Sequence, residues 1–364
     1  MNAALQPPSQ PPPLGKELHS HPFLQYRNRN MDRVTELRAA FEGSRVLITG
    51  GAGFIGSNLA HALCELGAEI TIVDSLIPEY GGNLHNLFAI RDRVRLNIAD
   101  VRDEHSMNYL VQGQDYLFNL AGQTSHLDSM RDPYTDLEIN CRSQLSILES
   151  CRKHNPKIKV VYASTRQIYG KPDYLPVDER HLLHPTDVNG INKMAGEWYH
   201  ILYNNVYGIP ACALRLTNTY GPRMRVKDAR QTFLGIWLKR VIDGEPIQVW
   251  GDGLQIRDFT YVDDCVEALL LAAKEPGAHG QVFNLGSDET INLRDLAALL
   301  IEINGAGSYE IIPFPADRKP IDIGDYYGDY RLIQGRLGWS PRVRLREGLA
   351  RTLAFYRERR EHYW

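Results

Sequence analysis

The stretch Val46-Leu47-Ile48-Thr49-Gly50-Gly51-Ala52-Gly53-Phe54-Ile55-Gly56 decides the fold of this 364-residue chain. It joins a short apolar run of the strand type to a helical pattern through three spaced glycines. In such a turn Gly50 permits a tight bend, Gly53 lets the backbone approach a pyrophosphate, and Gly56 allows the helix to pack closely on the strand. Because a helix N-terminus offers free N–H groups and the positive end of a dipole, the stretch predicts a dinucleotide site.

The second expected strand, Glu69–Val73, is followed by an acidic residue that suits a bound dinucleotide. Asp74 lies eighteen residues beyond Gly56. A carboxylate there accepts hydrogen bonds from ribose hydroxyls and repels a 2′-phosphate, which predicts NAD rather than NADP as the cofactor. Asp100, after the third expected strand, is placed to meet the adenine.

Apolar runs of strand length alternate with helical patterns over residues 45–216. Strands are expected at Arg45–Thr49, Glu69–Val73, Arg93–Asn97, Tyr116–Leu120, Lys159–Ala163 and Ala211–Leu216. Helices are expected between them at Phe54–Leu66, Asp103–Val111, Pro133–His154 and Asn189–Val206. Connections that contain such helices are right-handed crossovers between parallel strands, with helices on both faces of the sheet. The predicted fold class is therefore α/β, a Rossmann-type doubly wound parallel sheet.

The chain is expected to divide into three parts. Residues 1–43 are a leader, in which six prolines among polar residues predict a flexible tail over residues 1–30, followed by a short helix at Met31–Glu42. Residues 44–220 are the NAD-binding Rossmann domain. Residues 221–364 are mainly a smaller C-terminal substrate-binding lobe, with some segments that return to the sheet domain. In the lobe, helices are expected near Gln231–Ile242, Val262–Ala273, Leu293–Ile303 and from Leu345, and strands at Ile247–Trp250 and Gln281–Leu285.

Charge and cysteine content restrict the partners and the compartment. With 41 Lys and Arg residues against 44 Asp and Glu residues, the net charge is −3, so no broad positive field exists to bind nucleic acid. No apolar run approaches the roughly 18 residues that span a bilayer, and no secretion signal is visible, which predicts no membrane partner. The five cysteines are odd in number and widely spaced, with no pair that suits a metal. We expect a cytoplasmic protein without a bound metal.

Further motifs follow the glycine turn in order along the chain. They are Asn119-Leu120-Ala121-Gly122, Ala163-Ser164-Thr165-Arg166-Gln167-Ile168-Tyr169-Gly170, Leu214-Arg215-Leu216-Thr217-Asn218-Thr219-Tyr220-Gly221-Pro222-Arg223, Gly251-Asp252-Gly253, Arg257-Asp258-Phe259-Thr260-Tyr261-Val262-Asp263-Asp264 and Leu337-Gly338-Trp339-Ser340-Pro341. With them, residues from Arg45 to about Leu353 resemble the extended short-chain dehydrogenase/reductase family, in its NAD-dependent nucleotide-sugar epimerase/dehydratase branch. The resemblance implies NAD as the cofactor and a nucleotide-diphosphate sugar as the substrate.

The resemblance fails at one catalytic position. In the family a Tyr-x-x-x-Lys pair and an upstream Ser or Thr do the chemistry; Thr165 and Lys193 match, but Asn189 stands where the Tyr belongs. An amide cannot act as a base near neutral pH. Three explanations stay open: another base, a tyrosine such as Tyr169 that reaches in from elsewhere, or ligand binding without turnover. The candidates for another base are Lys193, if burial lowers its pKa, and His126 or Asp128 in the Gln123–Ser129 loop.

A second departure from the family restricts the reaction. The 4,6-dehydratases of this branch carry Thr-Asp-Glu where this chain has Thr165-Arg166-Gln167, and the related decarboxylases use a Glu at the position of Gln167. Arg and Gln cannot form an acid/base pair, although Arg166 is suited to hold a substrate carboxylate. Epimerisation needs the fewest extra groups. An NAD-dependent epimerase is therefore predicted by elimination, with a dehydratase or decarboxylase, or a non-catalytic binding protein, as the alternatives.

The resemblance also assigns the remaining site residues. It implies that Asn218 meets the diphosphate and that Arg257 and Arg318 hold phosphate oxygens, with Arg166 and Gln167 beside the sugar. The expected cofactor contacts are Gly50, Gly53, Phe54, Ile55, Gly56, Asp74, Asp100, Val101, Leu120, Ala121, Gly122 and Lys193. The helix pair Pro133–His154 and Asn189–Val206 resembles the dimer interface of the family, so a homodimer is expected.

Overall fold

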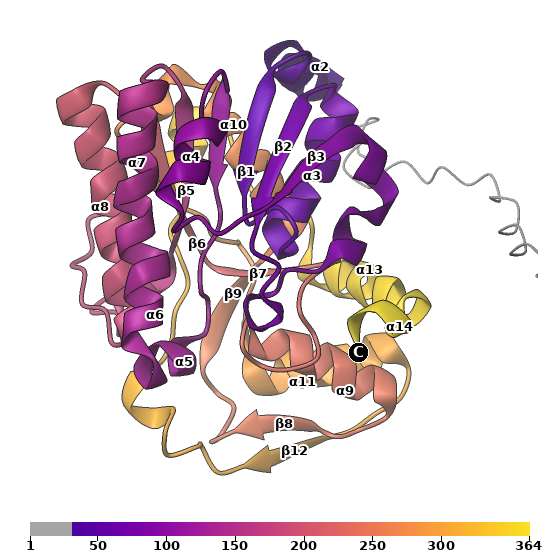
Figure 1. Ribbon diagram of the computed structural model, residues 1–364. Helices are drawn as coiled ribbons and strands as arrows, with labels where there is room; N and C mark the ends of the chain where they lie inside the picture. The colour runs from indigo at the N-terminus through magenta and orange to yellow at the C-terminus, as the bar shows by residue number, and fades with distance from the viewer. Residues whose placement is uncertain (1–30) are drawn as a thin grey trace, which may run out of the picture.

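The computed structural model describes residues 31–364, and the predicted proline-rich tail lies outside the described residues. A sheet domain forms the upper part of the molecule in Figure 1, and a smaller lobe lies below it. The central sheet has seven strands in the order β10-β6-β5-β4-β1-β2-β3, and all pairs are parallel. The strands are β1 (Arg45–Thr49), β2 (Glu69–Asp74), β3 (Val94–Ile98), β4 (Tyr116–Asn119), β5 (Lys159–Thr165), β6 (Ala211–Leu216) and β10 (Val282–Asn284). The predicted doubly wound sheet is thus confirmed.

Helices cover both faces of this sheet (Figure 1). On one face lie α2 (Met31–Phe41), α3 (Phe54–Leu66) and α10 (Val262–Lys274), and on the other lie α4 (Glu104–Leu110), α7 (Ser143–His154) and α8 (Val188–Tyr207). Alternate residues of β1 serve the two faces, since Val46 and Ile48 belong to one apolar cluster and Leu47 to the other. A strand buried on both sides needs such a continuous apolar run, which is why β1 was readable in the sequence.

The helix predicted over Pro133–His154 is interrupted. The structure has α6 (Pro133–Leu137), then a π-helical turn over Glu138–Arg142, and then α7. The wider turn lets Asn140 turn inward, where Nδ2 donates to the carbonyl oxygen of Gln123 at 2.9 Å and to Oδ2 of Asp136 at 3.0 Å. The prediction of one regular helix was wrong at this point because hydrophobic periodicity does not report a single inserted residue.

The lobe is built on two small sheets. One contains β7 (Asn218–Tyr220), β9 (Ile256–Tyr261) and β11 (Thr290–Asn292), and the other contains β8 (Ile247–Trp250) and β12 (Tyr309–Ile312). Three of its helices are α9 (Phe233–Asp243), α11 (Leu293–Asn304) and α13 (Leu345–Glu358). Two later segments belong to the sheet domain, because β10 pairs with β6 and α10 packs against α3. Among residues 31–364 no helix is long and apolar enough to cross a bilayer.

Candidate active site

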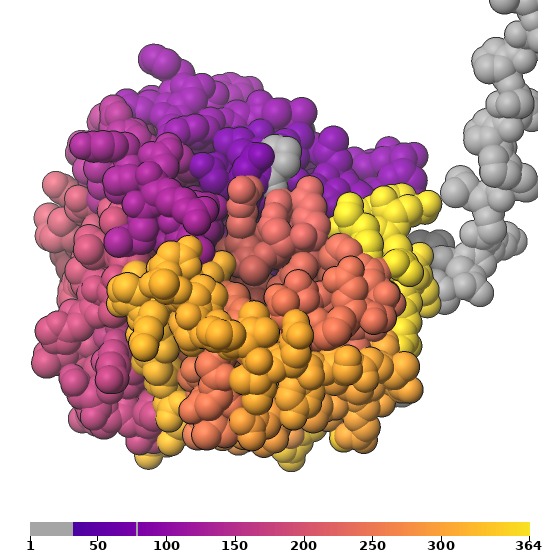
Figure 2. Space-filling model, turned by 90° about the horizontal axis from the view of Figure 1, so that it is seen from below, coloured from indigo at the N-terminus to yellow at the C-terminus, as the bar shows by residue number. Residues whose placement is uncertain are grey.

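Two neighbouring cavities open at the carboxyl edge of the sheet, next to the paired strands β1 and β4, from which the chain continues to β2 on one side and to β5 on the other. The larger, of about 560 Å³, lies between the sheet domain and the lobe, and the smaller, of about 130 Å³, lies beside the glycine turn. Phe54, Ile55, Leu120 and Gly122 line both of them. Seen from below, the lobe in salmon and orange meets the indigo and magenta sheet domain on this side of the molecule (Figure 2). The point where strand order reverses is where open α/β sheets bind ligands.

Two glycines that flank the turn between β1 and α3 have no room for a side chain. Gly50 has φ +70°, and a Cβ there would lie 2.9 Å from Cα of Ala121. A Cβ on Gly56 would lie 2.3 Å from the carbonyl oxygen of Gly50. The turn therefore presents bare backbone and the N-terminus of α3 to the smaller cavity, a cradle that fits the pyrophosphate of a dinucleotide.

The acidic residues predicted for the adenosine end lie around the same cavity. Asp74, at the end of β2, accepts hydrogen bonds from the N–H groups of Ala52 and Leu76, both at 2.9 Å. Burial raises the pKa of its carboxyl above the ordinary value. Asp100 is paired with Arg102, with Nη2 and Oδ2 2.6 Å apart. Of the predicted cofactor residues, those that line the smaller cavity are Gly50, Gly53, Phe54, Ile55, Gly56, Asp74, Asp100, Val101, Leu120, Ala121 and Gly122.

Lys193 and Thr165 line the larger cavity. Nζ of Lys193, from α8, donates to the carbonyl oxygen of Ala163 at 2.7 Å and lies 4.6 Å from the ring centroid of Tyr162. Burial lowers the pKa of Lys193 to about 8. Thr165 ends β5, and its Oγ1 accepts a hydrogen bond from the N–H of Gln167 at 3.2 Å. An amine that changes its charge near neutral pH thus shares a cavity with a hydroxyl that can still donate.

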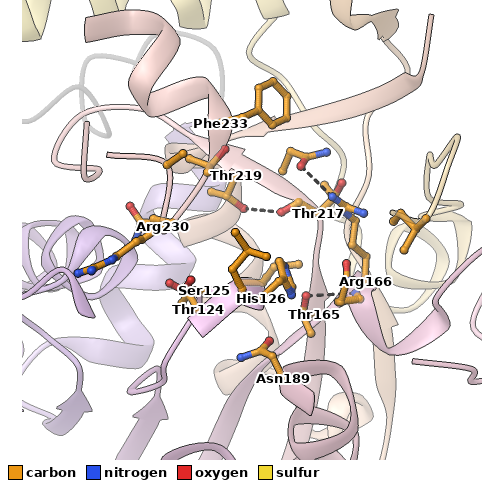
Figure 3. Close-up of a pocket in the computed structure, with 18 of the residues that line it drawn as sticks. Thr124, Ser125, His126, Thr165, Arg166, Asn189, Thr217, Thr219, Arg230 and Phe233 are labelled. Atoms are coloured by element: carbon orange, nitrogen blue, oxygen red, sulfur yellow. Dashed lines mark hydrogen bonds between the residues drawn. The ribbon is translucent and has the colours of Figure 1, made fainter. Parts of the chain in front are cut away.

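Asn189 is buried beneath Thr165 and His126 (Figure 3), where its amide is part of a polar cluster. Its Nδ2 donates to the carbonyl oxygen of Gln123 at 2.8 Å and to Oδ2 of Asp136 at 3.0 Å. Asp136 is fully buried and also accepts from the Asn140 and Asn192 amides, at 3.0 and 2.8 Å. Asn189 therefore helps to hold helix α8 against α6.

Tyrosine cannot replace the missing base from elsewhere among the described residues. Tyr169 is fully buried, and its hydroxyl contacts Oδ1 of Asn284 at 2.7 Å and Nη1 of Arg215 at 2.5 Å. Burial raises its pKa above the ordinary value. Within residues 31–364 no tyrosine lines the larger cavity. The hypothesis that Tyr169 reaches in was wrong, because its hydroxyl is bound to residues of β6 and β10.

His126 and Asp128 have different surroundings. The segment expected as a loop includes the first turn of helix α5 (His126–Arg131), capped by Ser125 Oγ, which accepts from the N–H of Asp128 at 3.2 Å. His126 lines the larger cavity, and its Nδ1 lies 2.8 Å from Oδ2 of Asp187. Asp128 does not line that cavity, and its Oδ2 lies 3.3 Å from Nε of Arg230. Of the predicted bases, His126 and Lys193 face the cavity.

Asp187 is a site residue that the sequence reasoning missed. Its Oδ1 caps helix α8 by accepting from the N–H of Gly190 at 2.7 Å, and its Oδ2 accepts from Nε2 of Gln167 at 2.9 Å. Burial raises the pKa of Asp187, but the contacts with His126 and Gly190 outweigh burial and hold it below its ordinary value. An acidic N-cap just before a helical pattern was the available signal.

The predicted phosphate ligands line the larger cavity on the lobe side. Arg257, on β9, is buried, with Nη1 bonded to the carbonyl oxygen of Ile256 at 2.9 Å and Nη2 3.7 Å from Oδ1 of Asp322. The guanidinium of Arg318 lies 4.6 Å from the ring centroid of Trp250. The substrate residues predicted from the sequence all line this cavity, namely Arg166, Gln167, Asn218, Arg257 and Arg318.

Comparison with known proteins places the chain in a family. Residues 46–286 match the NAD dependent epimerase/dehydratase family. A UDP-glucose 4-epimerase from Mycolicibacterium smegmatis is 31% identical over 320 residues, 86% of this chain and 99% of the relative. A dTDP-glucose 4,6-dehydratase from Streptomyces griseus is 32% identical over 330 residues, 88% of this chain and 96% of the relative. The solved structure of a Thermus thermophilus UDP-glucose 4-epimerase in complex with NAD is 30% identical and has a TM-score of 0.78, with 86% of this chain and 99% of that chain covered.

Proposed function

The chain belongs to the NAD dependent epimerase/dehydratase family, and from that premise we propose that it is an NAD-dependent epimerase of a nucleotide-diphosphate sugar. The larger cavity carries this proposal. It brings together a hydroxyl, an amine and an imidazole, from Thr165, Lys193 and His126, but its sugar end has Arg166 and Gln167 in place of an acid/base pair. Oxidation and reduction at one carbon need no such pair, whereas dehydration does.

The cofactor residues fit NAD. The bare glycine turn and the N-terminus of α3 suit the pyrophosphate, Asp74 suits the adenosine ribose, and Lys193 suits the nicotinamide ribose. When bound, NAD takes a hydride from a sugar carbon and later returns it to that carbon.

The protein side of the mechanism is proton transfer and positioning. The Thr165 hydroxyl hydrogen-bonds the reacting sugar hydroxyl, and Nε2 of His126 takes the proton of that sugar hydroxyl. The carboxylate of Asp187, with Oδ2 2.8 Å from Nδ1 of His126, orients the imidazole. This is the arrangement of a general base with a carboxylate that sets its tautomer. The Lys193 ammonium stabilises the developing oxyanion. His126 returns the proton when the sugar, turned in the cavity, is reduced on its other face.

The exposed side of α8 supports a homodimer as part of the proposal. Trp198, Leu202 and Val206 follow one another at four-residue spacing and are 56%, 48% and 60% exposed. Helix α7 lies beside α8 on the outside of the sheet domain (Figure 1). A second copy would cover this apolar stripe.

The state of the cysteines supports a cytoplasmic location as part of the proposal. The five cysteines of the chain are free thiols, as is usual in a reducing compartment.

The test is turnover of a panel of sugar nucleotides. The full chain with NAD is incubated with UDP-, GDP-, CDP- and dTDP-linked hexoses and uronates, and the products are separated and identified. The proposal expects a product of unchanged mass and inverted configuration at one hydroxyl-bearing carbon. Loss of about 18 or about 44 mass units would instead identify a dehydratase or a decarboxylase. Binding of a sugar nucleotide with no product and no reduction of NAD would identify a non-catalytic binding protein.

A further inference from the structure

The residues that line the larger cavity include many more cationic than acidic side chains. Six cationic residues line it, namely Arg166, Lys193, Arg230, Arg240, Arg257 and Arg318, against the single acidic residue Asp322 among the described residues. This local excess occurs in a chain whose net charge is −3. Arg230 is paired with Asp128, so part of the excess is balanced from outside the lining. The remainder indicates a ligand with several negative charges.

Among these six cations, Arg166 is the one with a buried guanidinium nitrogen that lacks a partner in the described part of the chain. The one hydrogen bond of its guanidinium within residues 31–364 runs from Nη2 to Oδ1 of Asn218 at 3.1 Å. Nη1 is buried and has no partner in that part of the chain, and the guanidinium lies 5.0 Å from the ring centroid of Tyr326. A buried donor on a charged group is destabilising unless it is paired. The fold therefore keeps an unpaired donor that a ligand can satisfy.

The position of Arg166 relates it to the sugar. It follows Thr165 directly at the end of β5, and the two side chains border the same space in Figure 3. Arg257 and Arg318 line the same cavity but come from the lobe. Burial and the neighbouring charge of Arg166 lower the pKa of Arg257 to about 10, although the carboxylates of Asp322, Asp325 and Asp258 act to raise it. Arg257 thus has a carboxylate nearby, Asp322 at 3.7 Å, whereas Nη1 of Arg166 has no partner among the described residues and is available to an anionic group of the ligand.

We infer that the sugar of the substrate bears a carboxylate, as a nucleotide-diphosphate uronate does, and that Arg166 binds this group. A planar guanidinium with free N–H donors suits the two oxygens of a carboxylate. The inference rests on the proposed function, because that function makes this cavity a nucleotide-sugar site. A substrate carboxylate would also explain why position 166 is an arginine, where the related dehydratases carry an acid.

Calorimetric titration of the full-length, NAD-loaded protein tests this binding. The probes are UDP-glucuronate, UDP-glucose and UDP. The corresponding glucuronate, glucose and free nucleoside diphosphate are also tested for dTDP, GDP and CDP. We expect at least one nucleotide series in which the uronate binds roughly 30-fold or more tightly than the neutral sugar. Arg166→Gln should bring that ratio close to one and change the affinity for the neutral sugar by less than about threefold.

Two further variants distinguish the specific contact of the Arg166 guanidinium from the effect of positive charge in the cavity. Arg166→Lys keeps the cation but not the fork, and should retain an intermediate preference for the uronate. Arg240→Gln removes a different positive charge from the same cavity and should change both affinities by the same factor. Circular dichroism checks folding, and if Arg166→Gln does not fold, the preference retained by Arg166→Lys decides.

Two results would overturn the inference. One is the absence of a uronate preference in every nucleotide series, and the other is an equal loss of affinity for the nucleoside diphosphates when Arg166 is changed, which would assign the guanidinium to the diphosphate. Turnover distinguishes the inference from the proposed function. An Arg166-dependent preference without any change of sugar configuration keeps the carboxylate site and rejects the epimerase. Epimerisation of neutral sugars without a uronate preference does the reverse.

Discussion

Oδ2 of Asp187 lies 2.8 Å from Nδ1 of His126, while Oδ1 of the same carboxylate caps helix α8. One side chain thus positions the imidazole at the cavity and the first turn of the helix that carries Lys193. A buried carboxylate that is held by an N–H group on one side is a rigid partner for a histidine on the other. The cap and the contact with His126 can be separated by substitution.

Asp187→Asn should preserve folding and impair catalysis. Asparagine caps helices as well as aspartate does, so the free energy of unfolding should fall only by the lost hydrogen bond from Gln167, about 1 kcal/mol. The amide cannot hold the Nδ1–H tautomer of His126, and we expect kcat to fall by roughly 10²- to 10⁴-fold. Steady-state kinetics and urea unfolding measure the two effects.

Asp187→Ala is the matched control, because it removes the cap as well as the charge. It should lower the free energy of unfolding by about 1 kcal/mol more than Asp187→Asn does. If Asp187→Asn keeps full activity, His126 is not the base that Asp187 positions.

Asn189→Ala should affect stability more than catalysis. The substitution removes hydrogen bonds to Gln123 and Asp136 in a buried cluster, and we expect a loss of about 1–3 kcal/mol in the free energy of unfolding. Asn192→Ala is the control, since Asn192 also donates to Asp136 but does not line the cavity. Both variants should keep kcat within about tenfold of the native value. A selective loss of kcat in Asn189→Ala would show that the amide contacts the substrate.

Asp74→Asn should relax the choice of cofactor. The carboxylate of Asp74 faces the smaller cavity, and a negative charge there repels a 2′-phosphate. We expect the native protein to bind NAD about 100-fold more tightly than NADP, and the variant to reduce this ratio to below about tenfold. Fluorescence titration measures both affinities. Asp100→Asn is the comparison, because Asp100 is neutralised by Arg102 and should leave the ratio unchanged.

Charged residues on α8 should dissociate the homodimer. Trp198→Glu combined with Leu202→Glu places two charges in the exposed apolar stripe, where desolvation in an interface is unfavourable. Sedimentation velocity should show a dimer for the native chain and a monomer for the double variant. Leu182→Glu changes another exposed leucine, outside α7 and α8, and should remain dimeric. A native monomer at micromolar concentration would reject the dimer.

The sheet and the glycine turn were predictable because their causes are local. Buried strands such as β1 and β4 are largely apolar runs, and Gly50 and Gly56 occupy points where a Cβ meets backbone. The lobe strands were harder to predict. Thr290–Asn292 is a three-residue strand that exists only because it pairs with β9, and its side chains are partly exposed. A hydrophobicity pattern of three residues cannot be distinguished from that of a loop in the sequence.

The site was predictable as a set of residues but not as a set of contacts. Asn189 could be singled out in the sequence, yet its role depends on Asp136, which only the packing of α6 against α8 brings near. The contact between His126 and Asp187 likewise joins two helix starts that are remote in the chain. Each residue type was informative, but its partner was set by tertiary structure.

The pH dependence of turnover should distinguish Lys193 as an electrostatic group from Lys193 as the base. Burial lowers its pKa to about 8, so the ammonium predominates below pH 8 and the neutral amine above it. If His126 is the base and the ammonium stabilises the oxyanion, kcat/KM should fall as pH rises through about 8. If Lys193 were the base, kcat/KM would rise over the same interval. Lys193→Met has no group that titrates there, so its residual activity should lose this limb of the profile, while a limb that persists in the variant would assign the ionisation to another residue.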